Sequence, residues 1–126
     1  MGGEASKLRK FLRKSCDNPV WVHSDESKEL TTKLFLNLDR DDSGKIELES
    51  DEMSGMWKVC NSAVHKVLAE KGCDSPEAFE YHHFQTLIHH VDSAEDGDQC
   101  LSYDEFFQVL ISLYRFVYKI EHENKV

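Results

Sequence analysis

The stretch that decides the fold is residues 39–52, which read DRDDSGKIELESDE. Seven of these residues are acidic, and the only bases among them are Arg40 and Lys45. A second stretch, residues 92–105, reads DSAEDGDQCLSYDE and holds six acids and no lysine or arginine. Carboxylates this close together repel one another unless a cation lies among them. Both stretches are therefore predicted to bind a metal ion.

The two stretches are parts of one unit that is repeated with an offset of 53 residues. At this offset they share acids, a central glycine and an aliphatic residue: Asp39 and Asp92, Gly44 and Gly97, Leu48 and Leu101, Glu52 and Glu105. Apolar residues flank both stretches at spacings of three and four, which indicates helices. The sequence therefore predicts a helix, an acidic loop with a glycine and a second helix, used twice.

The first stretch resembles the calcium-binding loop of the EF-hand family. Oxygen-bearing side chains alternate, a glycine takes the sixth position and an aliphatic residue the eighth: Asp39, Asp41, Ser43, Gly44, Ile46. The resemblance covers about residues 25–120 and implies an all-α fold with one pair of EF-hands, the first at about residues 25–71 and the second at about 75–122. In such a pair the loops form a short two-stranded pairing, with Ile46 or Leu48 facing Leu101.

For the first loop, the resemblance implies that Ca²⁺ is held by Asp39, Asp41, Ser43 and Lys45, the last of these through its backbone carbonyl. The family's twelfth position is a bidentate glutamate, but here it is Ser50, and Glu52 follows two residues later. We predict a 14-residue loop in which Glu52 is the bidentate ligand. The alternatives are that Glu47 and Glu49 compensate, or that this loop binds calcium weakly.

The second loop allows two counts. Counting twelve residues back from Glu105 makes Ala94 the first position. Counting 14 residues from Asp92 instead puts Gly97 in the sixth place and resembles a longer type of EF-hand loop, which relies on backbone carbonyls and a final glutamate. The two counts together give the predicted ligands Asp92, Asp96, Asp98, Cys100 and Glu105, with Ser102 at a further ligand position in the shorter count.

Residues 1–24 are predicted to be a separate amphipathic segment. The chain begins Met-Gly-Gly-Glu-Ala-Ser, an acceptor pattern for N-myristoylation of Gly2. Five bases follow: Lys7, Arg9, Lys10, Arg13 and Lys14. Leu8, Phe11 and Leu12 fall on one helical face. The segment is predicted to bind an anionic membrane, or this face packs into the domain's own groove, and the two roles do not exclude each other. The organisation is similar to that of the neuronal calcium sensors and calflagins, although those proteins carry four hands.

Composition narrows the classes of function. The chain has 126 residues and a net charge of −9, which fits one domain and argues against nucleic acid as a partner. No secretory signal or membrane-spanning run is present, so a cytoplasmic location is expected. An acyl chain on Gly2 would attach the protein to the periphery of a membrane. The four cysteines are predicted to be free. No nucleophile–base pair or phosphate-binding loop is evident, and an enzyme is not expected.

The predicted function is that of a calcium sensor, which changes conformation with Ca²⁺ and exposes an apolar surface. Met53, Met56, Trp57 and the last helix would then bind a target helix or a second copy of the chain. That last helix carries a second apolar stripe that needs a cover: Phe107, Ile111, Tyr114 and Tyr118. The alternatives are a calcium buffer without a target, and a constitutive light-chain-like module whose loops have lost calcium.

Overall fold

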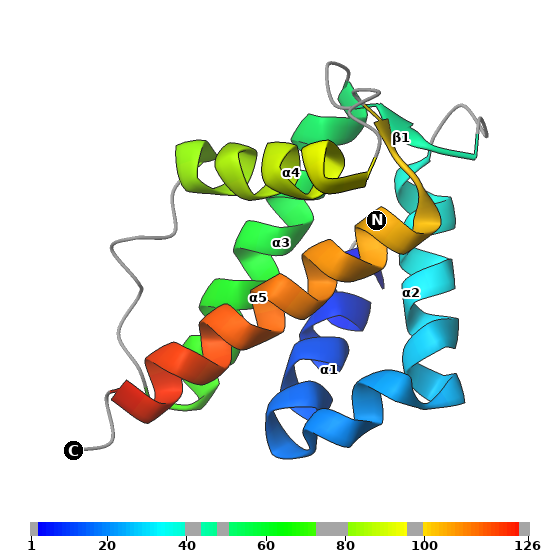
Figure 1. Ribbon diagram of the computed structural model, residues 1–126. Helices are drawn as coiled ribbons and strands as arrows, with labels where there is room; N and C mark the ends of the chain where they lie inside the picture. Colours follow the sequence, from blue (N-terminus) through cyan, green and yellow to red (C-terminus); the bar gives the residue numbers. More distant parts are fainter. Residues whose placement is uncertain (1–2, 40–43, 48–50, 73–80, 96–99, 124–126) are drawn as a thin grey trace.

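The computed structural model describes residues 3–39, 44–47, 51–72, 81–95 and 100–123. Five α-helices and two short strands are found in these ranges, which confirms the predicted all-α class (Figure 1). The elements in chain order are α1 (Gly3–Asp17), a 3-10 helix (Pro19–His23), α2 (Asp25–Leu38), β1 (Ile46–Glu47), α3 (Asp51–Glu70), α4 (Tyr81–Glu95), β2 (Cys100–Leu101) and α5 (Tyr103–Glu123). None of the described helices has both the length and the apolar character needed to cross a membrane.

The ends of the helices follow from local chemistry. The Ser24 hydroxyl accepts a hydrogen bond from the Ser27 amide at 3.2 Å and caps the start of α2. Asp25 and Glu26 in the first turn interact favourably with the helix dipole. The helix α3 ends at Glu70, and two residues later Gly72 has a φ of +77° while its amide donates to the Ala69 carbonyl at 3.1 Å.

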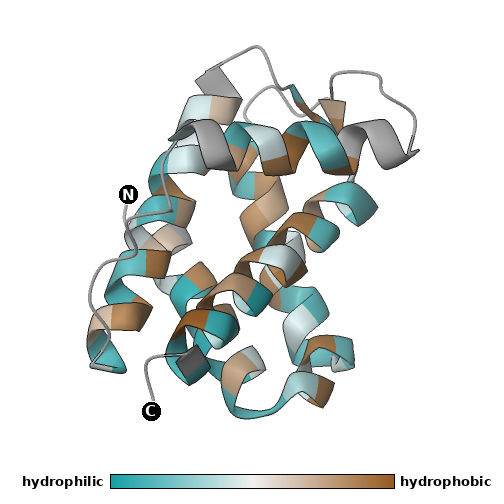
Figure 2. Cartoon of the chain, turned by 60° about the vertical axis from the view of Figure 1, so that its left-hand side comes forward, coloured by the Kyte–Doolittle hydropathy of each residue, from teal (hydrophilic) through white to brown (hydrophobic). Residues whose placement is uncertain are grey.

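The elements form two helix–loop–helix units that meet at their loops. The first unit is α2, β1 and α3, and the second is α4, β2 and α5. The strands β1 and β2 pair antiparallel and join the two units at one end of the molecule (Figure 1). Hydrophobic and hydrophilic residues alternate around each helix, as a packed amphipathic helix requires (Figure 2).

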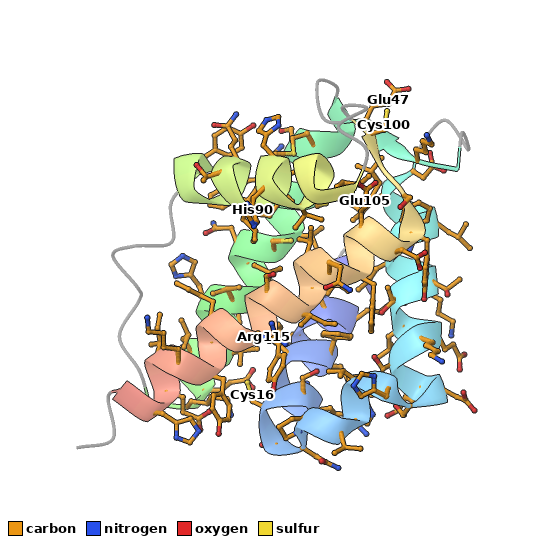
Figure 3. The ribbon with its side chains drawn as sticks, viewed as in Figure 1. Cys16, Glu47, His90, Cys100, Glu105 and Arg115 are labelled. Carbon is orange, nitrogen blue, oxygen red and sulfur yellow. The ribbon has the colours of Figure 1, made fainter. Side chains whose placement is uncertain are left out.

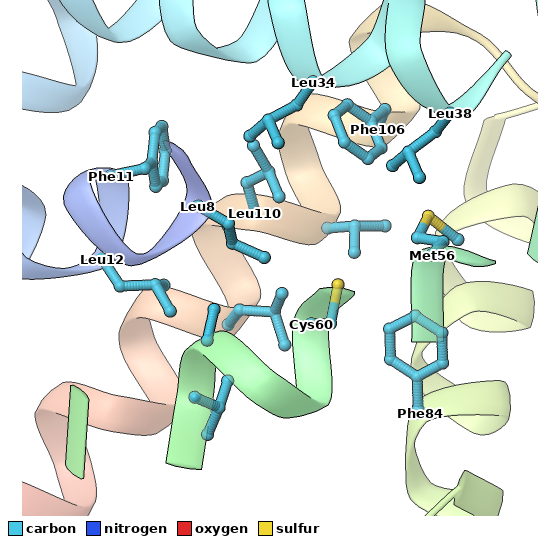
Figure 4. Packing of buried hydrophobic residues seen from close by; sticks show 14 of the residues in the cluster. Leu8, Phe11, Leu12, Leu34, Leu38, Met56, Cys60, Phe84, Phe106 and Leu110 are labelled. Carbon is cyan, nitrogen blue, oxygen red and sulfur yellow. The ribbon is translucent and has the colours of Figure 1, made fainter. Parts of the chain in front are cut away.

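The apolar face of α1 packs into the same core as these two units. Leu8, Phe11 and Leu12 are 1% exposed or less and lie among side chains of α2, α3 and α5 (Figure 4). Of the two roles predicted for this face, packing into the domain's own groove is therefore the one that the structure shows. Insertion of the same face into a bilayer would first require α1 to leave the core.

The helix α1 also covers the second apolar stripe of α5. The first apolar stripe of α5 ends at Ile120, which is half-buried, and its other members are buried: Phe106, Val109, Leu110, Leu113 and Val117. In the second stripe Phe107 is half-buried, and its ring contacts that of Phe11 with centroids 6.4 Å apart. Tyr118, near the end of the stripe, is 39% exposed. Helix α1 thus supplies a cover within the chain at Phe107, and Tyr114 is also packed against the core, while Tyr118 remains exposed.

The cysteines within the described ranges are free, as predicted, while Cys73 lies outside those ranges. Cys16 and Cys60 are buried, and Cys100 is half-buried. The Cys16 thiol lies at the boundary of α1 and α5, 3.9 Å from the Tyr114 carbonyl oxygen (Figure 3). Burial raises the pKa of Cys16 to about 11, so this thiol stays protonated at neutral pH and packs as a small apolar group.

Candidate metal centre

The loop that follows α2 is organised around the Asp39 carboxylate. Asp39 ends α2, and its amide still donates to the Phe35 carbonyl at 2.9 Å. Its side-chain Oδ2 accepts a hydrogen bond from the Gly44 amide at 2.7 Å. Gly44 has a φ of +86°, a conformation that glycine adopts at little cost. The carboxylate is therefore held at the mouth of the loop by the backbone of the residue five positions later.

The strands β1 and β2, one from each helix–loop–helix unit, pair with each other. In the antiparallel ladder Ile46 lies opposite Leu101, and Glu47 lies opposite Cys100. The side chains of Ile46 and Leu101 are fully buried, whereas Glu47 is exposed. Of the two predicted partners of Leu101, the structure pairs Ile46. Residues that pair across the ladder are therefore 55 positions apart in the sequence. The glycines of the two loops, Gly44 and Gly97, are 53 positions apart.

Glu105 is a buried carboxylate at the start of α5. It is 2% exposed, and its Oε1 accepts a hydrogen bond from the Ser102 amide at 2.8 Å. In return the Ser102 hydroxyl accepts a hydrogen bond from the Glu105 amide at 3.3 Å, which completes a reciprocal capping box. The cap fixes the side chain just below the strands, as Figure 3 shows, while Glu47 points away from it.

The chemistry of these described groups suits a hard cation. Asp39 is 5% exposed and Glu105 is 2% exposed, and burial of ionised carboxylates is costly unless charge or hydrogen bonds compensate. Backbone amides supply part of that compensation at both residues, and a divalent cation would supply more. Carboxylate and carbonyl oxygens are the ligands that Ca²⁺ prefers.

The predicted ligands fall into three groups. Four are described: Cys100 belongs to the strand ladder, Lys45 directly precedes it, Asp39 caps the end of α2 and Glu105 lies in the first turn of α5. Glu52 is in the first turn of α3 and Asp92 in the last turn of α4, but their side chains lie outside the described part of the structure. Asp41, Ser43, Asp96 and Asp98 lie outside the described ranges altogether, as does the predicted acylation site Gly2. Among the described residues, no three His, Cys, Asp or Glu side chains gather as a metal-binding group.

One residue near the site was missed by the sequence analysis. The Tyr103 hydroxyl donates to the Lys28 carbonyl at 3.2 Å and accepts from the Thr32 hydroxyl at 3.3 Å. Its ring contacts Phe35, with centroids 5.8 Å apart. Tyr103 therefore ties the first turn of α5, which carries Glu105, to the helix that ends at Asp39.

Comparisons with family models, with curated proteins and with solved structures found no match for this chain.

Replacing Gly44 with alanine is expected to lower the free energy of unfolding by about 1–2 kcal/mol. A Cβ at this position would meet no other atom within 4 Å, so the cost lies in the backbone conformation and not in a steric clash. Urea denaturation without calcium measures the change. Asparagine tolerates this conformation better than alanine does, so Gly44→Asn is the matched control and is expected to lose less. Equal losses for the two variants would contradict this account of Gly44.

Proposed function

We propose that the chain is a calcium-binding protein of the EF-hand class with one pair of hands, and that it acts as a calcium sensor. One observation carries the proposal: the Asp39 carboxylate accepts a hydrogen bond from the Gly44 amide at the mouth of an acidic loop. That loop then leads into a strand paired with the strand that precedes the buried Glu105. An acid at the first position, a glycine at the sixth and a carboxylate at the exit helix are what the calcium loop of this class needs.

In the first loop, the proposed ligands are Asp39, Asp41, Ser43, the Lys45 carbonyl and Glu52. The start of α3 at Asp51 supports the 14-residue length of this loop. Glu105 follows Leu101 of the ladder by four residues, and Glu52 follows the paired Ile46 by six. Each glutamate nevertheless belongs to the first turn of its exit helix. In the first loop, both the start of the exit helix and its glutamate therefore lie further along the chain from the ladder than in the second loop.

In the second loop, the structure favours the shorter count, which starts at Ala94. The helix α4 continues to Glu95, so Asp92 lies within the helix and two residues before the loop under this count. The proposed ligands are then Asp96, Asp98, the Cys100 carbonyl, Ser102 and Glu105. Ala94 at the first position has no side-chain oxygen, so this loop is expected to bind calcium more weakly than the first.

The proposed sensor action depends on side chains that are buried in this conformation. Met53 is 3% exposed and Met56 is fully buried, and both lie on the exit helix of the first loop. The half-buried Trp57 packs on Phe84 of α4 with ring centroids 5.3 Å apart. A rotation of α3 away from α4 would expose this adaptable surface to a target helix or a second copy of the chain. A calcium buffer would keep the same side chains covered.

Calorimetric titration of the full chain with calcium tests the proposal directly. Two binding events are expected, the weaker one from the second loop. Titration of an apolar-binding dye with and without calcium then separates the two modes of action. Increased dye fluorescence with calcium supports a sensor, and binding of calcium without that increase supports a buffer. Absence of any heat at millimolar calcium would refute calcium binding and favour a constitutive light-chain-like module.

A further inference from the structure

The outward side of α1 carries a row of bases on an otherwise acidic protein. Leu8, Phe11 and Leu12 occupy the buried side of the helix. The opposite side carries five bases, which we call the basic ridge: Lys7, Arg9, Lys10, Arg13 and Lys14. Their positions span about two turns, or roughly 10 Å of helix. The side chains of Lys10, Arg13 and Lys14 remain 44–45% exposed, so the ridge is open to solvent while α1 is docked.

Two glutamates from other helices flank the basic ridge, and each contacts two of its bases. Glu70, the last residue of α3, lies 3.2 Å from Arg13 and 3.8 Å from Arg9. Glu26, in the first turn of α2, lies 3.0 Å from Lys14 and 3.7 Å from Lys10. The two carboxylates therefore lie on opposite sides of the ridge and hold it between them.

Glu26 has a further partner that keeps its carboxylate oriented. The Trp21 indole Nε1 donates to Glu26 Oε1 at 2.8 Å. Hydrogen bonds from Lys14 and Trp21 lower the pKa of the Glu26 carboxyl below its ordinary value, so the group stays ionised at neutral pH. The Trp21 ring in turn packs on Phe11 with centroids 5.4 Å apart. Trp21 thus contacts both the buried side of α1 and the partner of its ridge.

The ridge keeps an excess of positive charge after these pairs are counted. Helix α1 carries five bases against Glu4 and Asp17, and with the partners Glu26 and Glu70 this leaves a charge of +1 on a chain of net charge −9. All these ion pairs are partly exposed and therefore weak. A surface with a higher density of negative charge could replace both glutamates as the ion-pair partner of these bases, and α1 would not have to move.

We propose that the basic ridge of the docked α1 binds an anionic lipid surface, lying flat on the headgroups with its apolar side still in the core. The acylation pattern at Gly2, at the same end of the chain, favours a lipid surface over other polyanions. Glu26 and Glu70 act as built-in competitors of the headgroups. They limit binding, so their removal strengthens it. This inference goes beyond calcium binding and does not depend on it.

Sedimentation of the unacylated full chain with vesicles tests the proposal at low salt and without calcium. Binding is expected to vesicles of phosphatidylserine and phosphatidylcholine in equal parts, and not to phosphatidylcholine alone. Each charge near an anionic surface changes the partition coefficient about fivefold. The Glu26→Gln/Glu70→Gln variant is expected to bind about 25-fold more tightly, and Lys10→Gln/Lys14→Gln to bind more weakly by a similar factor.

The control variant tests whether lipid binding depends on where a charge lies or only on the net charge of the chain. Asp104→Asn removes one exposed acid at the loop end of α5, away from the ridge, and is expected to change binding little. In a Trp57→Phe variant, which leaves Trp21 as the only tryptophan, the Trp21 emission is expected to stay unchanged with vesicles and unquenched by brominated lipids, because α1 stays docked. Quenching of Trp21, binding to neutral vesicles, no binding to anionic ones, or no gain in the Glu26→Gln/Glu70→Gln variant would each overturn the proposal.

Discussion

Replacing Phe11 with alanine is expected to lower the free energy of unfolding by about 3–5 kcal/mol. Phe11 is fully buried, and its ring contacts Trp21 and Phe107 edge-on, with centroids 5.4 and 6.4 Å away. The substitution removes apolar area from the core and leaves a cavity between α1, the 3-10 helix and α5, which these rigid neighbours cannot fill. Urea denaturation followed by circular dichroism measures the loss.

The matched control for Phe11 is an apolar residue outside the core. Val20 is 72% exposed on the 3-10 helix that follows α1, and Val20→Ala is expected to change stability by no more than about 0.5 kcal/mol. If Phe11→Ala instead costs less than about 1 kcal/mol, then α1 is a loosely attached arm and not part of the core. In that case its apolar face would be available to a membrane.

Replacing Glu105 with glutamine is expected to remove one of the two proposed calcium sites. Glutamine keeps the size of the side chain and an oxygen that can accept from the Ser102 amide, so the cap of α5 survives. It lacks the charge and the second oxygen that a bidentate ligand needs. Loss of a group that merely orients a ligand costs about 10–100-fold in metal affinity, and loss of a direct ligand is expected to cost more. Calorimetric titration with calcium counts the remaining sites.

Two further variants make this result specific. Asp104→Asn removes an exposed charge next to Glu105 and is expected to leave both sites in place. Glu52→Gln is expected to remove the other site and leave the one that depends on Glu105. If Glu52→Gln binds calcium as the wild type does, the 14-residue assignment of the first loop is wrong, and Glu47 or Glu49 becomes the candidate ligand. Two sites in Glu105→Gln would refute the assignment of the second loop.

The parts of the fold that depend on neighbouring residues could be predicted from the sequence. Gly72 follows the end of α3 because glycine adopts at little cost the positive φ with which helices commonly end. The spacing of Phe106, Val109 and Leu110 identified the buried face of α5, because burial follows the period of the helix. For the same reason Asp39 and Gly44 could be named as the organising residues of the first loop, where their hydrogen bond spans only five positions.

Contacts between distant segments could not be predicted, because periodicity identifies a face and not its partner. The sequence showed that α1 is amphipathic, but not that its apolar side lies against α2, α3 and α5. Glu70 pairs with Arg13 across 57 positions, and the Tyr103 hydroxyl reaches the Lys28 carbonyl across 75. The count of the second loop was likewise open in the sequence, because it depends on which residue Ile46 meets across the ladder.

The basic ridge has a mechanical consequence for the first loop. Glu26 lies at the start of α2 and Glu70 at the end of α3, so α1 bridges the two helices at the ends that are distant from the loop between them. A change in the angle between α2 and α3 must therefore stretch the ion pairs on at least one side of α1. If calcium widens that angle, a lipid surface that takes the bases from Glu26 and Glu70 removes a restraint on the widening. Thermodynamic reciprocity then requires calcium to strengthen lipid binding by the same factor as lipid strengthens calcium binding.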